Sequence, residues 1–154
     1  MSDIQVVIFN LNNELCSVEA SLVYKIEKYS EVSFIPQLPD YIKGLYNLRG
    51  RVVPVIDLNK RFNLGDSEIT KKSKIIITEK NNQLLGFMVN NVLEIINLDE
   101  NSIDKSEAIL KVNNKKYIKG IGKKNDKLFS IIDLNEVLHI DEFEEVTEVV
   151  LNKV

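Results

Sequence analysis

The chain has 154 residues, 44% of them apolar, with a formal net charge of −3 and a pI near 5.3. This length supports one compact domain, or two small halves that share a core, and excludes two ordinary independent domains. The acidic balance gives no overall attraction to nucleic acid or to an anionic membrane. The one cysteine, Cys16, excludes an internal disulfide and suits a reducing compartment.

The predicted elements begin with a short apolar run, IQVVIF at residues 4–9, after an acidic start. The run is too short for a signal peptide or a membrane span, so we expect a cytoplasmic protein without membrane insertion. Further strand-like runs lie at residues 23–29, 74–78, 84–89 and 92–96. Turn pairs stand at Asn12-Asn13, Arg49-Gly50, Asn81-Asn82, Asn113-Asn114 and Asn125-Asp126. Short strands with frequent turns predict an all-β fold.

An internal repeat runs through the chain. YIKG stands at residues 41–44 and 117–120, and IDLN at 56–59 and 132–135, both pairs 76 residues apart. Upstream, NNELCSVEASLVYKI from residue 12 aligns with NNQLLGFMVNNVLEI from residue 81, an offset of 69. A duplication explains both offsets if the second half carries seven extra residues in a polar connecting loop around residues 99–107. We expect a single domain over residues 1–154 made of two related β-barrel subdomains, with repeat units at about residues 12–62 and 81–138.

Helices are expected to be few and short. Residues 58–62 and 134–139 should each form a helical turn or two, with Asp57 and Asp133 as N-caps and Glu136 at capping-box spacing. The C-terminal stretch has an apolar stripe at helical spacing: Phe143, Val146, Val150 and Val154. We expect this helix to pack its stripe on the β fold; the alternative is a helix that binds a partner.

No residue pattern indicates an enzyme, a cofactor or a metal site. His139 ends a predicted helix without a second histidine or a cysteine cluster, so we expect it to be a surface or packing residue. Cys16 is expected to be a core thiol. GIGK at residues 120–123 lacks the earlier glycine of a phosphate-binding loop. Asp57 and Asp133 are better explained as caps than as a carboxylate pair.

The first repeat copy carries the candidate binding site. All three arginines, Arg49, Arg51 and Arg61, lie in it, although the chain has 17 lysines. A guanidinium offers a planar fork of donors that an ammonium lacks. In a hairpin with its turn at Arg49-Gly50, the returning strand is apolar on both faces, and Pro54 suggests an edge or a bulge. These features predict a docking surface; packing of that face on the other half is the alternative.

The second copy has KKNDKLFS where the first has NLRGRVVP. It keeps the scaffold landmarks and loses the arginines, the glycine and the proline. We therefore assign function mainly to the first hairpin tip. The lysine-rich second tip is expected to be a solvated face, with a weak contact to an anion as the alternative.

These motifs resemble the CheW family, the adaptor proteins of bacterial chemotaxis. The family's G-x-x-N-L-R-G segment stands at residues 44–50, and its P-[VI]-[VI]-[DN]-L strand at residues 54–58. The V-x-x-I segment at residues 23–26 and G-F-x-V-x-x-V at residues 86–92 extend the resemblance over essentially the whole chain.

The resemblance implies two SH3-like five-stranded β-barrel subdomains with short helices and a C-terminal helix. It also implies a non-enzymatic adaptor that couples the cytoplasmic tip of chemoreceptors to the regulatory domain of the histidine kinase CheA. Such an adaptor works in the cytoplasm at membrane-associated receptor arrays, and other CheW copies are an open further partner. Two alternatives stay open: an adaptor of a non-flagellar kinase pathway, and a small-barrel nucleic-acid-binding module, which the acidic pI disfavours.

The resemblance also implies two contact regions. The family's kinase-facing hairpin falls on Asn47, Leu48, Arg49 and Gly50. With the neighbouring residues of the hairpin, the candidate kinase- or receptor-binding site comprises Gly44, Asn47, Leu48, Arg49, Gly50, Arg51 and Pro54. The receptor-binding groove comprises Val7, Val23, Ile26 and Val92, which the apolar pattern alone would place in the core. The family often has Glu before the isoleucine of its V-x-E-I segment, whereas this chain has Lys25 there and keeps Glu94 in the second copy. A reversed rim charge changes the choice of partner more than the fold.

Overall fold

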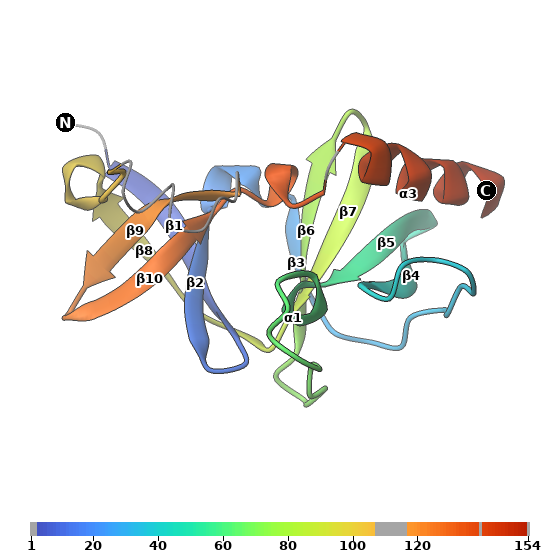
Figure 1. The fold of residues 1–154 in the computed structure, drawn as a ribbon, viewed down its shortest axis with the longest axis horizontal. Coiled ribbons are helices and arrows are strands. Elements are labelled where there is room, and N and C mark those ends of the chain that lie inside the picture. The colour runs from blue at the N-terminus through green and yellow to red at the C-terminus, as the bar shows by residue number, and fades with distance from the viewer. Residues whose placement is uncertain (1–2, 107–116, 139, 154) are drawn as a thin grey trace.

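Two five-stranded sheets form the molecule (Figure 1), which a computed structural model describes for residues 3–106, 117–138 and 140–153. The first sheet contains β1 (Asp3–Leu11), β2 (Glu14–Glu19), β8 (Asn91–Asp99), β9 (Ile118–Lys124) and β10 (Lys127–Ile132), in the order β8-β1-β2-β10-β9. The second sheet contains β3 (Lys25–Lys28), β4 (Ile42–Leu48), β5 (Arg51–Asp57), β6 (Lys74–Lys80) and β7 (Gln83–Val89), in the order β3-β6-β7-β5-β4.

Short helices join the strands, and a longer helix follows them. These helices are η1 (Ala20–Leu22), α1 (Leu58–Arg61), η2 (Glu100–Ser102), η3 (Leu134–Glu136) and α3 (Ile140–Lys153). The predicted all-β fold class with short helices and a C-terminal helix is confirmed. The predicted Asn113-Asn114 turn, His139 and Val154 lie outside the described residues. No helix in the described ranges is long and apolar enough to cross a membrane.

The two sheets have the same topology once the halves of the chain are exchanged. Strands β1 to β5 correspond in order to β6 to β10, so each sheet combines a hairpin from one half with three strands from the other. The parallel contacts agree with the repeat alignment, because Ser17 pairs with Ile131 and its repeat equivalent Gly86 pairs with Val55. Each repeat unit therefore supplies strands to both sheets. The division into one domain with two related subdomains stays a prediction.

Apolar side chains gather in three clusters. Alternate residues of β1 show the principle, because Val6 and Ile8 join a cluster of first-sheet strands while Val7 and Phe9 join a central cluster shared by both sheets. The second sheet has its own cluster around Val53 and its neighbours. Both faces of the inner strands are thus buried, which explains their nearly continuous apolar sequences.

The glycine of YIKG has the same role in both halves. The loop before each copy places one residue, Ser33 or Asp104, in an isolated bridge with the edge strand just after the glycine. A Cβ on Gly44 would lie 2.4 Å from the carbonyl oxygen of Ser33, and one on Gly120 would lie 2.9 Å from that of Asp104. Only glycine allows this close crossing of the two backbones.

The predicted caps and the C-terminal helix are confirmed. Asp57 accepts a hydrogen bond from the backbone N–H of Lys60, and Asp133 accepts one from that of Asn135. Helix α3 lies beside β5 (Figure 1), and Val146 belongs to the central cluster. The helix therefore packs its apolar stripe on the β fold.

Pro54 does not mark an edge strand, so that part of the prediction is wrong. The predicted bulge has support, because the β4–β5 pairing shifts register between Ile42 and Gly44, next to the Leu45–Pro54 pair. Strand β5 lies between β4 and β7, and Pro54 pairs with Leu45 of β4. The N–H and C=O of Leu45 bond to Ser33 and therefore point away from β5. On the other side, the parallel pairing with β7 begins only at Val55. Proline is tolerated inside this sheet because no ladder donor is lost at its position.

Candidate functional site

The β4–β5 hairpin has the predicted two-residue turn. Arg49 and Gly50 both have positive φ, 48° and 88°, which is the pattern of the turn that best fits the twist of two antiparallel strands. The side-chain oxygen of Asn47 accepts a hydrogen bond from the backbone N–H of Gly50 at 2.8 Å. Backbone and side chain together hold the tip in one conformation.

Arg49 projects from this tip into solvent. The residue is exposed, and it has no hydrogen bond or ion pair with any described residue. All the donors of its guanidinium are therefore available to a partner. A planar fork of this kind recognises a carboxylate with two parallel hydrogen bonds.

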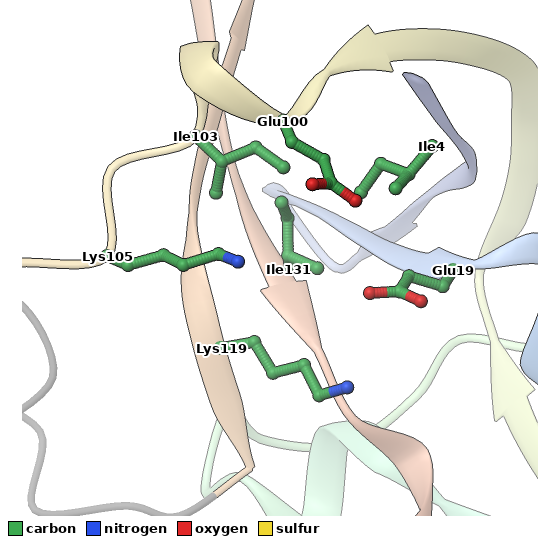
Figure 2. Close-up of a pocket in the computed structure, with 7 residues that line it drawn as sticks. All are labelled: Ile4, Glu19, Glu100, Ile103, Lys105, Lys119 and Ile131. Atoms are coloured by element: carbon green, nitrogen blue, oxygen red, sulfur yellow. The ribbon is translucent and has the colours of Figure 1, made fainter. Parts of the chain in front are cut away.

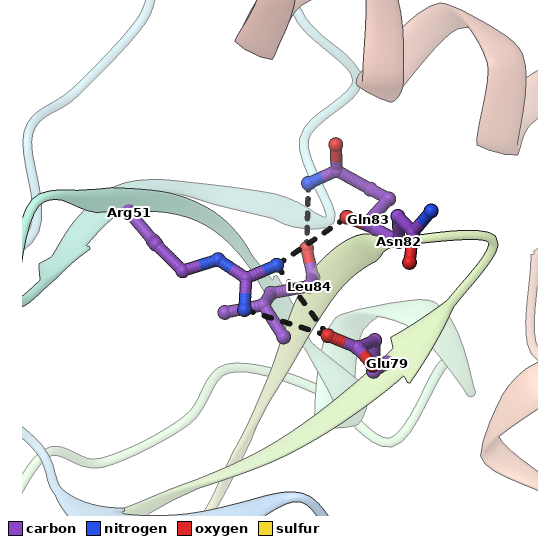
Figure 3. Close-up of polar contacts among 5 residues, drawn as sticks. All are labelled: Arg51, Glu79, Asn82, Gln83 and Leu84. Carbon is purple, nitrogen blue, oxygen red and sulfur yellow. Dashed lines mark hydrogen bonds and ion pairs between the residues drawn. The ribbon is translucent and has the colours of Figure 1, made fainter.

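Arg51 is already engaged within the chain. Its Nη1 and Nη2 lie 3.4 Å from Oε2 of Glu79, and Nη2 also donates to the backbone oxygen of Asn82 at 3.3 Å (Figure 3). Both charged side chains are more than 40% exposed, so the pair adds little stability. The contact instead joins the hairpin to the β6–β7 turn and restricts how far the hairpin can move.

The remaining residues of the predicted hairpin site are buried. Gly44 is closed off by Ser33, Leu48 belongs to the cluster of the second sheet, and Pro54 lies inside the sheet. These three residues support the hairpin and offer no contact surface. The exposed members of the predicted site are Asn47, Arg49, Gly50 and Arg51.

The repeat equivalent of this hairpin, β9–β10, has the same backbone with different chemistry. Its turn residues Asn125 and Asp126 also have positive φ, 51° and 63°. Lys127 takes the place of Arg51 and has no ion pair with a described residue. The repeat equivalent of Glu79 is Asn10, which carries no charge. The fold thus presents two matched hairpins, and only the first has an arginine tip and an internal ion pair.

The predicted groove residues all contact the central cluster. Val23, Ile26 and Val92 are half-buried and pack against it. Val7 is 1% exposed, so it lies in the core and cannot touch a partner. The groove prediction is therefore limited to the other three residues as possible contact surface.

Three exposed apolar side chains near these residues were not predicted as site residues. Tyr24, Leu93 and Ile95 are 52%, 49% and 55% exposed. Tyr24 and Leu93 are repeat equivalents, in the segments VYKI and VLEI, and Ile95 pairs with Val7 across β1 and β8. The signal that could have revealed them is the doubled V-x-x-I motif. Large apolar side chains left in solvent at such a place indicate a contact surface.

The described part of the chain shows neither a reactive thiol nor a group of side chains that could hold a metal ion. Burial, with the charge of Glu14 adding to it, raises the pKa of the Cys16 thiol to about 12, so the thiol stays protonated at neutral pH. Within the described ranges, no group of three or more histidine, cysteine or acidic side chains could hold a metal ion. The arrangement suits binding through surfaces.

Comparisons with known proteins agree with this geometry. A family model described as the CheW-like domain matches residues 5–142. Chemotaxis protein CheW of Bacillus subtilis (strain 168) is 34% identical over 134 residues, which cover 87% of this chain and 86% of the relative. Chemotaxis protein CheW of Helicobacter pylori is 30% identical over 138 residues, which cover 90% of this chain and 83% of the relative.

A solved structure has the same fold. The scaffolding protein TtCheW from Thermoanaerobacter tengcongensis superposes with a TM-score of 0.80 at 35% identity, and the match covers 92% of each chain. The resemblance inferred from the NLRG segment and the PVIDL strand is confirmed. The chain belongs to the CheW-like domain family and is a scaffold or adaptor protein of chemotaxis.

Proposed function

We propose that the protein is a non-enzymatic adaptor that couples the cytoplasmic tip of chemoreceptors to the regulatory domain of a CheA-type histidine kinase. The observation that carries the proposal is the unpaired Arg49 at the tip of a fixed hairpin, in a chain of the CheW-like family. The protein would act in the cytoplasm, at membrane-associated receptor arrays. Two separate contact regions support a bridging role.

The hairpin is the first contact region. Asn47 and the positive φ of Gly50 preset the turn, and the Arg51–Glu79 contact restrains its direction. A preset tip loses little conformational entropy on binding, so more of the interaction energy remains as affinity. Arginines at the centre of an interface often dominate its binding energy. We infer that Arg49 binds a carboxylate of the kinase or of the receptor.

The surface around the central cluster is the second contact region. Val23, Ile26 and Val92 are half-buried and pack against the central cluster, and the side chain of Ile95 is exposed. An apolar strip of this kind fits the apolar face of a partner helix. Lys25 alternates with Ile26 along β3 and so belongs to the opposite face of the strand, where its Nζ is 3.8 Å from Oε1 of Glu27. Its effect on the choice of partner stays a prediction.

Direct binding to two purified partners tests the proposal. We expect Arg49→Ala to weaken binding to the kinase regulatory domain or to the receptor tip by about 2 kcal/mol, as for a typical hot-spot arginine. The matched control is Asn125→Ala, because Asn125 occupies the same turn position in the second hairpin. Unchanged binding of both partners by the Arg49 variant would remove Arg49 from the site. Failure of the wild type to bind either partner would overturn the coupling role itself.

A further inference from the structure

A cavity of about 250 Å³ lies on the first sheet, apart from the β4–β5 hairpin of the second sheet. Its apolar lining consists of Ile4, Ile103 and Ile131, which pack in the cluster of the first sheet. Figure 2 shows Ile131 at the centre of the cavity, with charged side chains around it. The volume is slightly below the usual range for sites of drug-sized molecules, so only a small ligand would fit.

Four charged side chains surround the isoleucines. The carboxylates of Glu19 and Glu100 lie on one side of Ile131, and the amines of Lys105 and Lys119 lie on the other (Figure 2). The side chains of Glu19, Glu100 and Lys105 form no hydrogen bond or ion pair with any residue that the structure describes. The Nζ of Lys119 lies 3.6 Å from Oδ2 of Asp133. The cavity thus has an anionic and a cationic side that are not paired with each other.

The second sheet shows that the fold does not require this cavity. The repeat equivalents of Glu19 and Ile131 are Met88 and Val55, and both are fully buried. They belong to the cluster of the second sheet, where Tyr29 and other side chains pack against it. The same place in the repeat is therefore filled with apolar side chains. The cavity thus lies where the first sheet has the charged Glu19 in place of the buried Met88 of the second sheet.

We propose that this cavity binds a small zwitterion of the α-amino acid class with an apolar side chain. The ligand's carboxylate lies between Lys105 and Lys119, and its ammonium group faces Glu19 and Glu100. Its side chain packs on the isoleucines. Hydrogen bonds between ionised groups are stronger than neutral ones, and the opposite charges of the two sides select a molecule that carries both. The proposal does not depend on the adaptor role.

Titration of the full chain with L-leucine, followed by ¹⁵N–¹H NMR, tests the proposal. The expected result is saturable shifts at the backbone amides of Glu19, Lys119 and Ile131. Isoamylamine and isocaproate have the leucine skeleton with only one of the two charges, and each should bind about tenfold more weakly. An affinity for either analogue equal to that for L-leucine would overturn the zwitterion assignment, and no saturable shift with L-leucine would overturn the site.

Variants locate the ligand. Glu19→Gln and Lys119→Met each remove one charge from a side chain that lines the cavity, and each should weaken L-leucine binding by about tenfold. The matched control is Lys43→Met, because Lys43 is the repeat equivalent of Lys119 on the second sheet. The amide spectrum of each variant shows directly whether it is folded. Wild-type affinity in both cavity variants would contradict the proposal.

Discussion

Arg49 and Arg51 lie only two residues apart, yet their surroundings give them different roles. Arg49 sits at the turn and has no partner among the described residues, whereas Arg51 contacts Glu79 and Asn82 on the neighbouring turn. Arg49 lies in the turn itself, whereas Arg51 is the first residue of strand β5. We therefore assign contact with a partner to Arg49, and positioning of the hairpin to Arg51.

Exchange of the charges at Arg51 and Glu79 tests the positioning role. Arg51→Glu or Glu79→Arg alone should weaken partner binding by about 0.5 kcal/mol, the range of an exposed ion pair, because the hairpin then moves more freely. The double variant Arg51→Glu/Glu79→Arg should recover most of the loss, as measured by calorimetric titration. Lys127→Glu on the second hairpin is the control. If the double variant binds no better than Arg51→Glu, Arg51 contacts the partner directly.

Two glycines of the hairpin should respond differently to a methyl group. In Gly44→Ala the new Cβ meets the backbone oxygen of Ser33 at 2.4 Å, so the edge crossing must move, at a cost of about 2 kcal/mol or more. In Gly50→Ala the new Cβ meets open space, and only the positive φ of 88° costs free energy, about 1 kcal/mol. Urea unfolding measures both values. Equal losses would contradict the structural role of the YIKG glycine.

At the scale of elements, α3 is attached to the second sheet by a compact polar cluster. Nη1 and Nη2 of Arg61 donate to the two carboxylate oxygens of Glu142 at 2.8 and 2.7 Å, and Nε donates to the backbone oxygen of Val137. The hydroxyl of Tyr41 donates to Glu142 at 2.8 Å, and the guanidinium of Arg61 lies over the Tyr41 ring. The third arginine of the first repeat copy is therefore structural.

The cluster of Tyr41, Arg61 and Glu142 should make the free energy of unfolding fall as the pH becomes alkaline. Burial, together with the hydrogen bond and the charge of Glu142, raises the pKa of Tyr41 above its ordinary value of 10.0. The folded state therefore holds this proton more tightly than the unfolded state. The stabilisation is complete below pH 10 and is lost as the pH rises above it. Urea unfolding across this range should show a shallower decline for Tyr41→Phe than for the wild type; an identical decline would contradict the role of Tyr41.

Elements were more predictable than the sheets that contain them. The Arg49-Gly50 turn and the Asp57 cap depend on neighbouring residues, so local sequence was enough to predict them. The placement of Pro54 and of Val7 depends on β7 and β8, which lie far along the chain. The position of Pro54 inside a sheet also depends on the bridge between Ser33 and Leu45, which the sequence around Pro54 does not predict.

In the whole molecule, the two halves of the duplicated chain exchange strands, so that each sheet contains strands of both halves. The repeat alignment correctly related β5 to β10 and β2 to β7, because the equivalent residues share a register. It could not show that each sheet would combine strands of both halves, since an alignment relates residues without pairing them. The exposed Ile95 was missed for a similar reason, because its exposure depends on what the rest of the fold leaves uncovered.

Fragments of the chain test this exchange. A cut in the loop between α1 and β6 separates residues 1–68 from residues 69–154, and each fragment then lacks strands of both sheets. We expect each fragment alone to show no cooperative thermal unfolding, because neither can bury the central cluster. An equimolar mixture should regain the circular dichroism and the cooperative transition of the intact chain. Cooperative folding of either fragment alone would contradict the exchanged topology.

We propose that one hairpin of the duplicated pair, β4–β5, carries the adaptor's specific contact. Calorimetric titration of the kinase regulatory domain and of the receptor tip into wild type, Arg49→Ala and Asn125→Ala tests it most directly. We expect a loss of about 2 kcal/mol for Arg49→Ala with at least one partner, and wild-type affinity for Asn125→Ala. Equal affinities of all three proteins for both partners, or equal losses in the two variants, would contradict it.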